Sequence, residues 1–215
     1  YTQILHVSDI HNNPIAYRFI EQIVESFGVD IIVDTGDLTD FGTPLETLFL
    51  EKIESLEIPY LFVAGNHDSP QVINALSDVK NVINVHKKIL TVNGIEFIGI
   101  NDPASMSNNV IPPVQEEIRE YAIKLNGLMN SRQRTPDILL IHNPQLAKQF
   151  AGRIPTVLFG HSHQHEIEID KGTVLVNAGT TGAAGIRGLG ATQEVPYSLV
   201  LLSFQQQQTD STEVK

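Results

Sequence analysis

The sequence predicts an α/β fold in which two β-sheets pack against each other and helices cover the outside. Three observations indicate this fold. Short runs rich in Ile, Val and Leu are typical of strands buried on both faces. Amphipathic segments with apolar residues at helical spacing alternate with these runs. Two further pairs of strand-like runs are each joined by a two-residue turn, which indicates antiparallel hairpins.

The individual elements follow in order along the chain. Apolar runs predict buried strands at residues 3–9, 29–33, 58–63, 138–141 and 156–159. Amphipathic segments predict helices at residues 15–27, 45–56 and 114–129. Hairpin strands are predicted at residues 89–92 and 95–100, around Asn93-Gly94, and at residues 166–170 and 173–177, around Lys171-Gly172. Prolines occur near expected first helical turns, where a missing N–H costs least: Pro14, Pro44, Pro70 and Pro144.

Composition favours one folded domain at residues 1–204, followed by a polar tail or linker at residues 205–215. The tail, QQQQTDSTEVK, is low in complexity and short of apolar residues. A hydrophobic content of 41% with 18% charged residues is that of a globular chain and not of a disordered one. Two long loops, at residues 101–113 and 179–194, are expected to be functional or mobile.

Composition also excludes several classes of function. The net charge is −11 and no cluster of Lys or Arg stands out, so nucleic acid is a poor candidate partner, because it requires a basic face. The absence of cysteine excludes disulfides, thiolate nucleophiles and Cys-ligated metals. The longest apolar runs, such as PYSLVLLSF, are of strand length and fall short of the roughly 18 residues of a membrane helix.

Compartment and oligomeric state are left open by the sequence. A soluble, cytoplasmic domain is the default prediction. The chain starts at Tyr1, without Met or a signal-peptide pattern, which suggests a processed protein or a domain excised from a larger or membrane-anchored protein.

Polar side chains gather where each predicted buried strand ends. In open α/β sheets, ligands bind in the crevice beyond the carboxyl ends of the strands. Five strand ends that deliver only Asp, Asn and His therefore predict a metal site. The candidate ligands are Asp9, His11, Asp37, Asn66, His142, His161 and His163.

The spacing and chemistry of these residues have physical reasons. Residues two apart on an extended segment point the same way, so Asp9 and His11 can bind one ion, and His161 and His163 have the same spacing. Carboxylate and imidazole without thiolate suit Mn, Fe, Zn, Ni or Co better than Ca or Cu(I). Seven ligands exceed one tetrahedral site and fit two ions that share a bridging carboxylate. Glycines precede ligand positions where the backbone must turn tightly: Gly36, Gly65 and Gly160.

Five motifs occur in a fixed order between Asp9 and His163: Asp-x-His, Gly-Asp-x-x-Asp, Gly-Asn-His-Asp, a lone His, and Gly-His-x-His. This order resembles the calcineurin-like metallophosphoesterase superfamily, in its compact bacterial-type phosphodiesterase and phosphatase branch. The resemblance implies a two-sheet αββα sandwich with two divalent or trivalent metal ions. It assigns Asp9, His11 and His163 to the first ion, Asn66, His142 and His161 to the second, and Asp37 to the bridge between them.

The resemblance also implies a reaction, the hydrolysis of a phosphoester bond. A hydroxide that bridges the metals would attack phosphorus, and the ions would offset charge on the phosphoryl oxygens. His67, held by Asp68, resembles the proton donor to the leaving alkoxide, so these two are the predicted catalytic residues. The first expectation is a phosphodiesterase that acts on a small molecule or a nucleotide.

Two other functions stay open. One is a phosphomonoesterase, and the other is a non-catalytic, protein-binding scaffold of the same fold. The runs GDLTDFG and GNHD depart from the Gly-Asp-x-Val-Asp-Arg-Gly and Gly-Asn-His-Glu of the protein Ser/Thr phosphatases. Every motif residue is present, including the proton donor, which favours an enzyme over a scaffold.

Several polar residues outside the motifs carry weaker expectations. Asn13 and Arg187 are candidate contacts to the substrate phosphate, and a solvated loop arginine is the alternative for Arg187. The other expectations are structural: Asp34 and Asp40 orient neighbours or cap turns, His6 is a hydrogen-bonded core residue, His86 lies at the surface, and His165 is structural.

Overall fold

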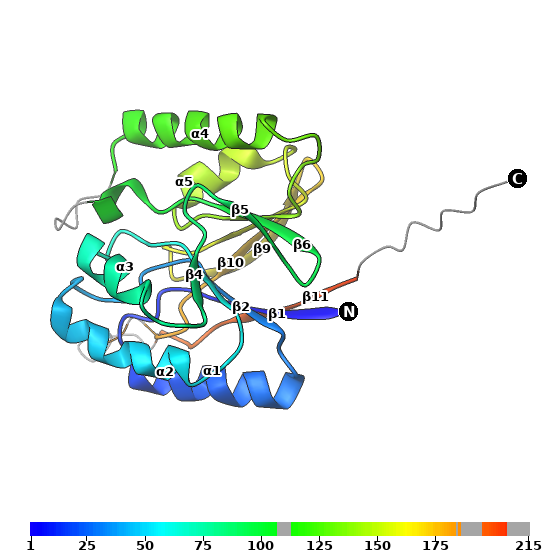
Figure 1. The fold of residues 1–215 in the computed structure, drawn as a ribbon. Coiled ribbons are helices and arrows are strands. Elements are labelled where there is room, and N and C mark those ends of the chain that lie inside the picture. The colour runs from blue at the N-terminus through cyan, green and yellow to red at the C-terminus, as the bar shows by residue number, and fades with distance from the viewer. Residues whose placement is uncertain (107–112, 184, 186–194, 206–215) are drawn as a thin grey trace, which may run out of the picture.

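A computed structural model describes residues 1–106, 113–183, 185 and 195–205. The described chain forms four layers in the order helices, sheet, sheet and helices (Figure 1). The predicted αββα sandwich is therefore confirmed. Most of the predicted tail at residues 205–215 lies outside the described residues. None of the described helices is long and apolar enough to cross a membrane.

The first sheet has five strands in the order β11-β1-β2-β3-β4. Neighbouring strands from β1 to β4 are parallel, and β11 pairs antiparallel with β1. The strands are β1 (Thr2–Val7), β2 (Ile31–Asp34), β3 (Tyr60–Phe62), β4 (Val82–Asn84) and β11 (Val200–Phe204). β4 was not predicted, because Val82–Asn84 has only two apolar residues and is only partly buried, so it leaves no apolar run in the sequence.

The second sheet has six strands in the order β5-β6-β7-β8-β10-β9. Its centre is parallel, and the two predicted hairpins, β5–β6 and β9–β10, are confirmed at its edges. The strands are β5 (Ile89–Val92), β6 (Ile95–Gly99), β7 (Ile138–Leu140), β8 (Thr156–Phe159), β9 (His165–Asp170) and β10 (Thr173–Ala178).

Helices cover both outer faces. The α-helices are α1 (Pro14–Phe27), α2 (Leu50–Glu54), α3 (Pro70–Leu76), α4 (Gln115–Asn130) and α5 (Pro144–Ala147), and the 3₁₀ helices are η1 (Pro44–Phe49), η2 (Pro103–Met106) and η3 (Lys148–Phe150). All four prolines singled out in the sequence begin a helix, as predicted. The single helix predicted at residues 45–56 was wrong, because η1 buries none of its side chains and only α2 packs inward through Leu50 and Ile53.

Three apolar clusters hold the layers together. One lies between the first sheet and α1 to α3, and includes Leu5, Ile20 and Phe62. A second lies between the other sheet and helices α4 and α5. The third joins the two sheets, with Val33 and Phe97 facing each other's layer. Because the central strands β2, β3, β7 and β8 are buried on both faces, they form continuous apolar runs in the sequence.

Candidate metal centre

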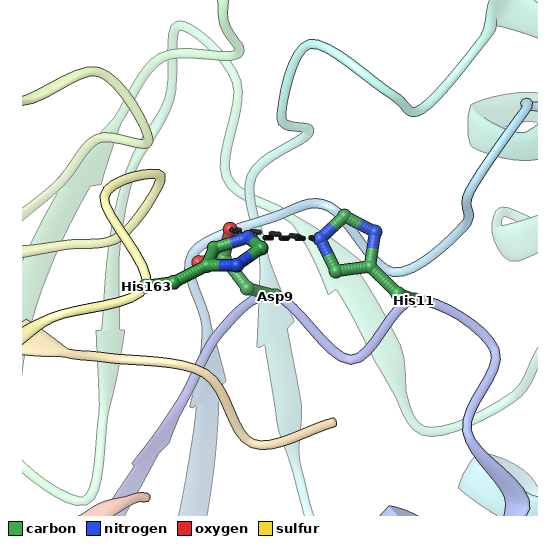
Figure 2. Close-up of side chains that lie close together, drawn as sticks. All are labelled: Asp9, His11 and His163. Carbon is green, nitrogen blue, oxygen red and sulfur yellow. Dashed lines mark hydrogen bonds and ion pairs between the residues drawn. The ribbon is translucent and has the colours of Figure 1, made fainter. Parts of the chain in front are cut away.

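The predicted ligands converge in two groups beyond the carboxyl ends of the parallel strands. Asp9, His11 and His163 offer three ligand atoms that lie within 4.8 Å of one another (Figure 2). A second group with the same property consists of Asp37, His142 and His161. Asn66, the seventh predicted ligand, joins the second group through its side-chain oxygen.

The first group brings one carboxylate oxygen and two imidazole nitrogens together. His163 Nε2 lies 3.1 Å from Asp9 Oδ1 and 3.1 Å from His11 Nε2 (Figure 2). The other nitrogen of His11, Nδ1, lies 3.2 Å from the carboxylate of Asp40. Since a carboxylate accepts, the ring proton of neutral His11 belongs on Nδ1, and Nε2 turns its lone pair toward the group.

The surroundings of the Asp9 carboxylate show whether the first group fits a cation. Its Oδ2 accepts hydrogen bonds from Ser8 Oγ at 2.6 Å and from the His161 amide at 2.9 Å. Its Oδ1 is buried and makes no hydrogen bond of good geometry with the described residues, and the nearest ring nitrogens, Nε2 of His163 at 3.1 Å and of His11 at 3.9 Å, can donate to it only when they carry a proton. A buried carboxylate oxygen without a donor is costly, and a cation between Oδ1 and the two imidazoles would remove that cost. The donor set therefore fits a metal ion.

The second group shows the same convergence of acceptors. His142 Nδ1 lies 2.8 Å from the carbonyl oxygen of Thr35, so Nδ1 carries the proton. His142 Nε2 then faces Asp37 Oδ2 at 3.3 Å and Asn66 Oδ1 at 3.1 Å. His161 Nδ1 lies 2.9 Å from the same Asn66 oxygen. A second cation fits among these four atoms.

The pKa shifts of the second group also indicate a site that attracts cations. Burial acts to lower the pKa of His142, but the charge and hydrogen bond of Asp37 outweigh it and raise the pKa well above its ordinary value. Burial likewise opposes ionisation of Asp37, yet His142 holds the pKa of Asp37 below its ordinary range. The site therefore attracts positive charge, which protons or metal ions can supply.

The two groups are directly connected. The main-chain amide of His161, in the second group, donates to Asp9 Oδ2 in the first. Asp37 contacts His142 in its own group, and its attraction extends to His11. Asp37 as a carboxylate shared by two ions stays a prediction.

The backbone at the ligands differs from the extended geometry that we expected. β1 ends at Val7, and Asp9 and His11 have φ angles of +53° and +49°. Three more ligands share the left-handed region: Asp37, His161 and His163. Such conformations cost roughly 1–3 kcal/mol each outside glycine and persist where tertiary contacts hold them. Here the Asp9 and His11 amides donate to the carbonyls of Gly36 and Asp37.

Three glycines allow the ligand loops to touch. Gly36 has φ +101° and lies against Gly65, so a Cβ on either residue would collide with the opposite loop. A Cβ on Gly160 would collide with Ser8 Oγ and approach Asp9 Oδ2 to 2.6 Å. The predicted need for glycine before these ligands is confirmed.

The predicted pairing of His67 with Asp68 is corrected by the structure. His67 Nδ1 lies 2.7 Å from the carbonyl oxygen of Asp40. Asp68 instead accepts from the amides of Asp37, Gly65 and Thr39, at 2.8 to 3.0 Å. The adjacent side chains of His67 and Asp68 thus have different partners. Asp68 positions the loop that carries Asp37, and the His67 ring is oriented by the Asp40 carbonyl.

A supporting residue that we did not predict is Glu46. Its carboxylate accepts from the amides of Asp40, Phe41 and Thr43 and from the side chain of Asn12. It therefore fixes the loop that places Asp40 beside His11 and His67. The spacing Thr43-x-x-Glu46 is that of a capping box, a signal that was present in the sequence.

The remaining expectations have mixed outcomes. The predicted phosphate contact of Asn13 is not supported, because its Nδ2 donates to Gly182 O and Tyr197 Oη and its Oδ1 caps α1. Arg187 lies outside the described residues. His6 is buried and its Nε2 lies 3.0 Å from Thr35 Oγ1, as expected for a core histidine.

Three further polar residues complete the comparison. Asp34 bonds Gly36 N and Tyr60 Oη, so it orients its neighbours as predicted. His86 was placed at the surface by the sequence, but it is partly buried, and its Nδ1 accepts from the Asn101 amide at 2.9 Å. The cause is the bridge between His86 and Gly99, which draws the segment onto the second sheet. His165 begins β9 and is exposed.

An αββα sandwich with paired carboxylate–imidazole groups at its strand ends defines a class of proteins with a dinuclear metal centre. The family model of the calcineurin-like phosphoesterases matches residues 2–165. The chain belongs to this family, whose members are phosphoric ester hydrolases that use a dinuclear metal site.

Individual relatives agree with the family. The chain is 28% identical to the DNA double-strand break repair protein Mre11 of Saccharolobus solfataricus, over 83% of this chain and 54% of that protein. It is 32% identical to a probable glycerophosphodiester phosphodiesterase, GpdQ, of Arcobacter nitrofigilis, over 33% of this chain and 21% of that protein. The chain thus spans about half the length of the Mre11 relative.

Among solved structures, the protein TT1561 of Thermus thermophilus superposes with a TM-score of 0.69 at 17% identity. The match covers 85% of this chain and 91% of that one. At this identity the likeness concerns the fold.

Proposed function

We propose that this protein is a dinuclear metal-dependent phosphodiesterase that acts on a small molecule or a nucleotide. The observation that carries the proposal is the convergence of two groups of acceptor atoms, around Asp9 and around Asp37, with His67 beside them. When bound, two ions such as Mn, Fe, Zn, Ni or Co would activate water and offset charge on the phosphoryl oxygens.

The residues of the chain have separate tasks in this proposal. Asp9, His11 and His163 would hold one ion, and His142, His161 and Asn66 would hold the other, with Asp37 of the second group as the carboxylate that the two ions would share. Asp40 and the Thr35 carbonyl accept from the outward nitrogens of His11 and His142 and so fix the direction of the two rings.

His67 supplies the proton. Its Nδ1 is committed to the Asp40 carbonyl, which leaves Nε2 as the atom that gives a proton to the leaving oxygen. Nε2 lies 4.0 Å from Asp37 Oδ2, on the side of the ring that faces the second ligand group. A positioned acid of this kind matters most for leaving groups that are poor without protonation.

A small diester is the proposed substrate for two reasons, one for the diester bond and one for the small size. The Arcobacter relative carries the name of a glycerophosphodiester phosphodiesterase. The net charge of −11 opposes binding of long nucleic acids, although Mre11 is named as a DNA repair protein, so a small diester suits this chain better than DNA.

The test combines metal analysis with three substrates: bis(p-nitrophenyl) phosphate, p-nitrophenyl phosphate and a single-stranded oligonucleotide. We expect about two metal ions per chain and the highest kcat/KM on the diester. Higher kcat/KM on the monoester would mean a phosphatase, and cleavage of the oligonucleotide above both would mean a nuclease. A chain that binds no metal and hydrolyses none of them would be a scaffold.

A further inference from the structure

A cavity of about 430 Å³ opens beside α3, β4 and η2. Its volume lies in the range of small-molecule sites. Two of its lining residues connect it to the candidate site: Pro70 begins α3 three residues after His67, and Asn101 accepts from the Ala64 amide at 3.0 Å, two residues before Asn66. The cavity therefore adjoins the segment that carries the proton donor and a candidate ligand of the second ion.

The polar wall of this cavity is rich in donors. Asn84 Oδ1 accepts from the His86 amide and Asn101 Oδ1 from the Ala64 amide, so each carboxamide is oriented with its Nδ2 hydrogens left for a ligand among the described residues. His86 Nδ1 accepts from the Asn101 amide, which places the ring proton on Nε2. Burial, helped by Lys87 and Lys88, lowers the pKa of His86 to about 4, so the ring is neutral at pH 7.

The rest of the lining is apolar, cationic or uncharged polar, the polar residues being Asn74, Ser77 and Ser105. Pro70, Ile73 and Met106 supply apolar surface, and Lys88 supplies an ammonium group. No carboxylate lines the cavity among the residues that the structure describes, although the chain as a whole carries a net charge of −11. An anionic ligand is therefore not repelled here.

We propose that this cavity binds the nucleoside part of a nucleotide substrate whose phosphoester lies at the metal centre. A nucleobase presents ring nitrogens and carbonyl oxygens to donors such as Asn84 and Asn101, and carboxamides commonly pair with base edges. Its flat faces suit the apolar surface of Pro70, Ile73 and Met106. A glycerol group has no such faces, and an acyl chain would leave the carboxamide donors unpaired.

This proposal deepens the proposed function: it rests on that function for the reaction at the metal centre, whereas binding of the nucleoside is independent of the reaction. Binding is therefore tested without hydrolysis. The probe is adenosine, which has no phosphate, titrated by calorimetry into the metal-loaded protein. Ser77, an exposed residue at the end of α3, lines the cavity, and Ser77→Phe would fill it. Ser55→Phe is the matched control, because Ser55 is also exposed, ends α2, and makes the same hydroxyl bond to a carbonyl three residues earlier.

We expect saturable binding of adenosine that Ser77→Phe weakens at least tenfold and Ser55→Phe leaves unchanged. In inhibition of methyl p-nitrophenyl phosphate hydrolysis, adenosine 5′-monophosphate should have a Ki at least tenfold below that of ribose 5-phosphate. Absence of adenosine binding, equal binding by both variants, or equal Ki values would overturn the proposal. Adenosine binding without any hydrolysis would support the cavity and refute the proposed reaction instead.

Discussion

The Nδ1 atom of His67 lies 2.7 Å from the carbonyl oxygen of Asp40. A carbonyl only accepts, so this contact fixes the tautomer of the ring and leaves Nε2 for proton exchange. The His67 and His11 rings meet edge to face, with centroids 5.4 Å apart. His67 therefore stands beside the candidate ligands with its orientation fixed through Nδ1.

This arrangement predicts the effect of His67→Ala. Both metal ions should stay bound, because the ring is no member of either ligand group. The kcat for an alkyl diester should fall about 10²–10⁴-fold, the usual contribution of a positioned acid. The fall should be smaller for p-nitrophenyl esters, since p-nitrophenolate leaves without a proton. The measurements are metal content by mass spectrometry and kcat across leaving groups of graded pKa.

His165→Ala, at an exposed histidine of β9, is the control for loss of an imidazole and should change neither quantity. Full activity of His67→Ala on an alkyl diester would show that another group, or water, protonates the leaving oxygen.

Asp68→Asn should behave differently from His67→Ala. An amide group in place of a carboxylate oxygen would confront a backbone N–H with another donor, either at Asp37 or at Thr39. A buried donor left unsatisfied costs about 1–3 kcal/mol, so the free energy of unfolding should fall by that amount. Urea unfolding measures it, with the exposed Asp78→Asn as the reference.

Metal affinity should fall as well, because Asp68 positions the loop of Asp37. If Asp68→Asn kept its stability and metal affinity but lost activity only on poor leaving groups, Asp68 would act through His67 after all.

Two Gly→Ala changes should alter the stability of the protein in opposite directions. Gly127→Ala in α4 meets nothing within 4 Å and should stabilise the protein by roughly 0.5–1 kcal/mol through helix propensity. Gly160→Ala places a methyl group against Ser8 Oγ and Asp9 Oδ2, so it must displace a candidate ligand. Calorimetric metal titration and thermal unfolding should show weaker metal binding and lower stability for Gly160→Ala alone. Unchanged metal affinity in that variant would show that the Asp9 loop can move away from the added methyl group without loss of the metal site.

Much of this architecture could be read from the sequence, for a physical reason. Strands buried on both faces leave unbroken apolar runs, and the chain beyond each carboxyl end meets its neighbours at one edge. The order of polar residues after those runs therefore predicted one site at this edge, and the structure brings the seven residues together there in two groups. Whether they bind metal stays a prediction.

What the sequence did not predict depends on tertiary contacts. The left-handed backbone at Asp9 and His11 could not be predicted, because Asp and His adopt it more often than most residues but only at a minority of positions, and here the facing loop supplies the carbonyl acceptors. The partner of Asp68 was misjudged for a related reason, since proximity in sequence does not set the direction of a side chain. The split between η1 and α2 reflects which residues find a core to pack against, a property of the assembled layers.

The stability of the protein should depend on pH through His6. Burial lowers the pKa of His6 to about 3, partly opposed by the charge of Asp9, against an ordinary value of 6.5 in the unfolded chain. Between these values the unfolded chain binds the proton and the folded protein does not, so the free energy of unfolding falls as the pH drops below 6.5. The loss approaches about 1.4 kcal/mol per pH unit, or roughly 2–3 kcal/mol by pH 4.5.

The measurement is urea unfolding of the wild type and of His6→Gln at several pH values from 7.5 to 4.5. Gln keeps an N–H for Thr35 Oγ1, the partner of His6, but does not titrate. The carboxylates titrate in both proteins and cancel in the difference. We expect the advantage of the wild type over His6→Gln to be constant above pH 7 and to shrink by roughly 2–3 kcal/mol toward pH 4.5. His165→Gln, at an exposed histidine, should show no such trend, and a pH-independent difference for His6→Gln would mean that His6 can be protonated within the folded protein.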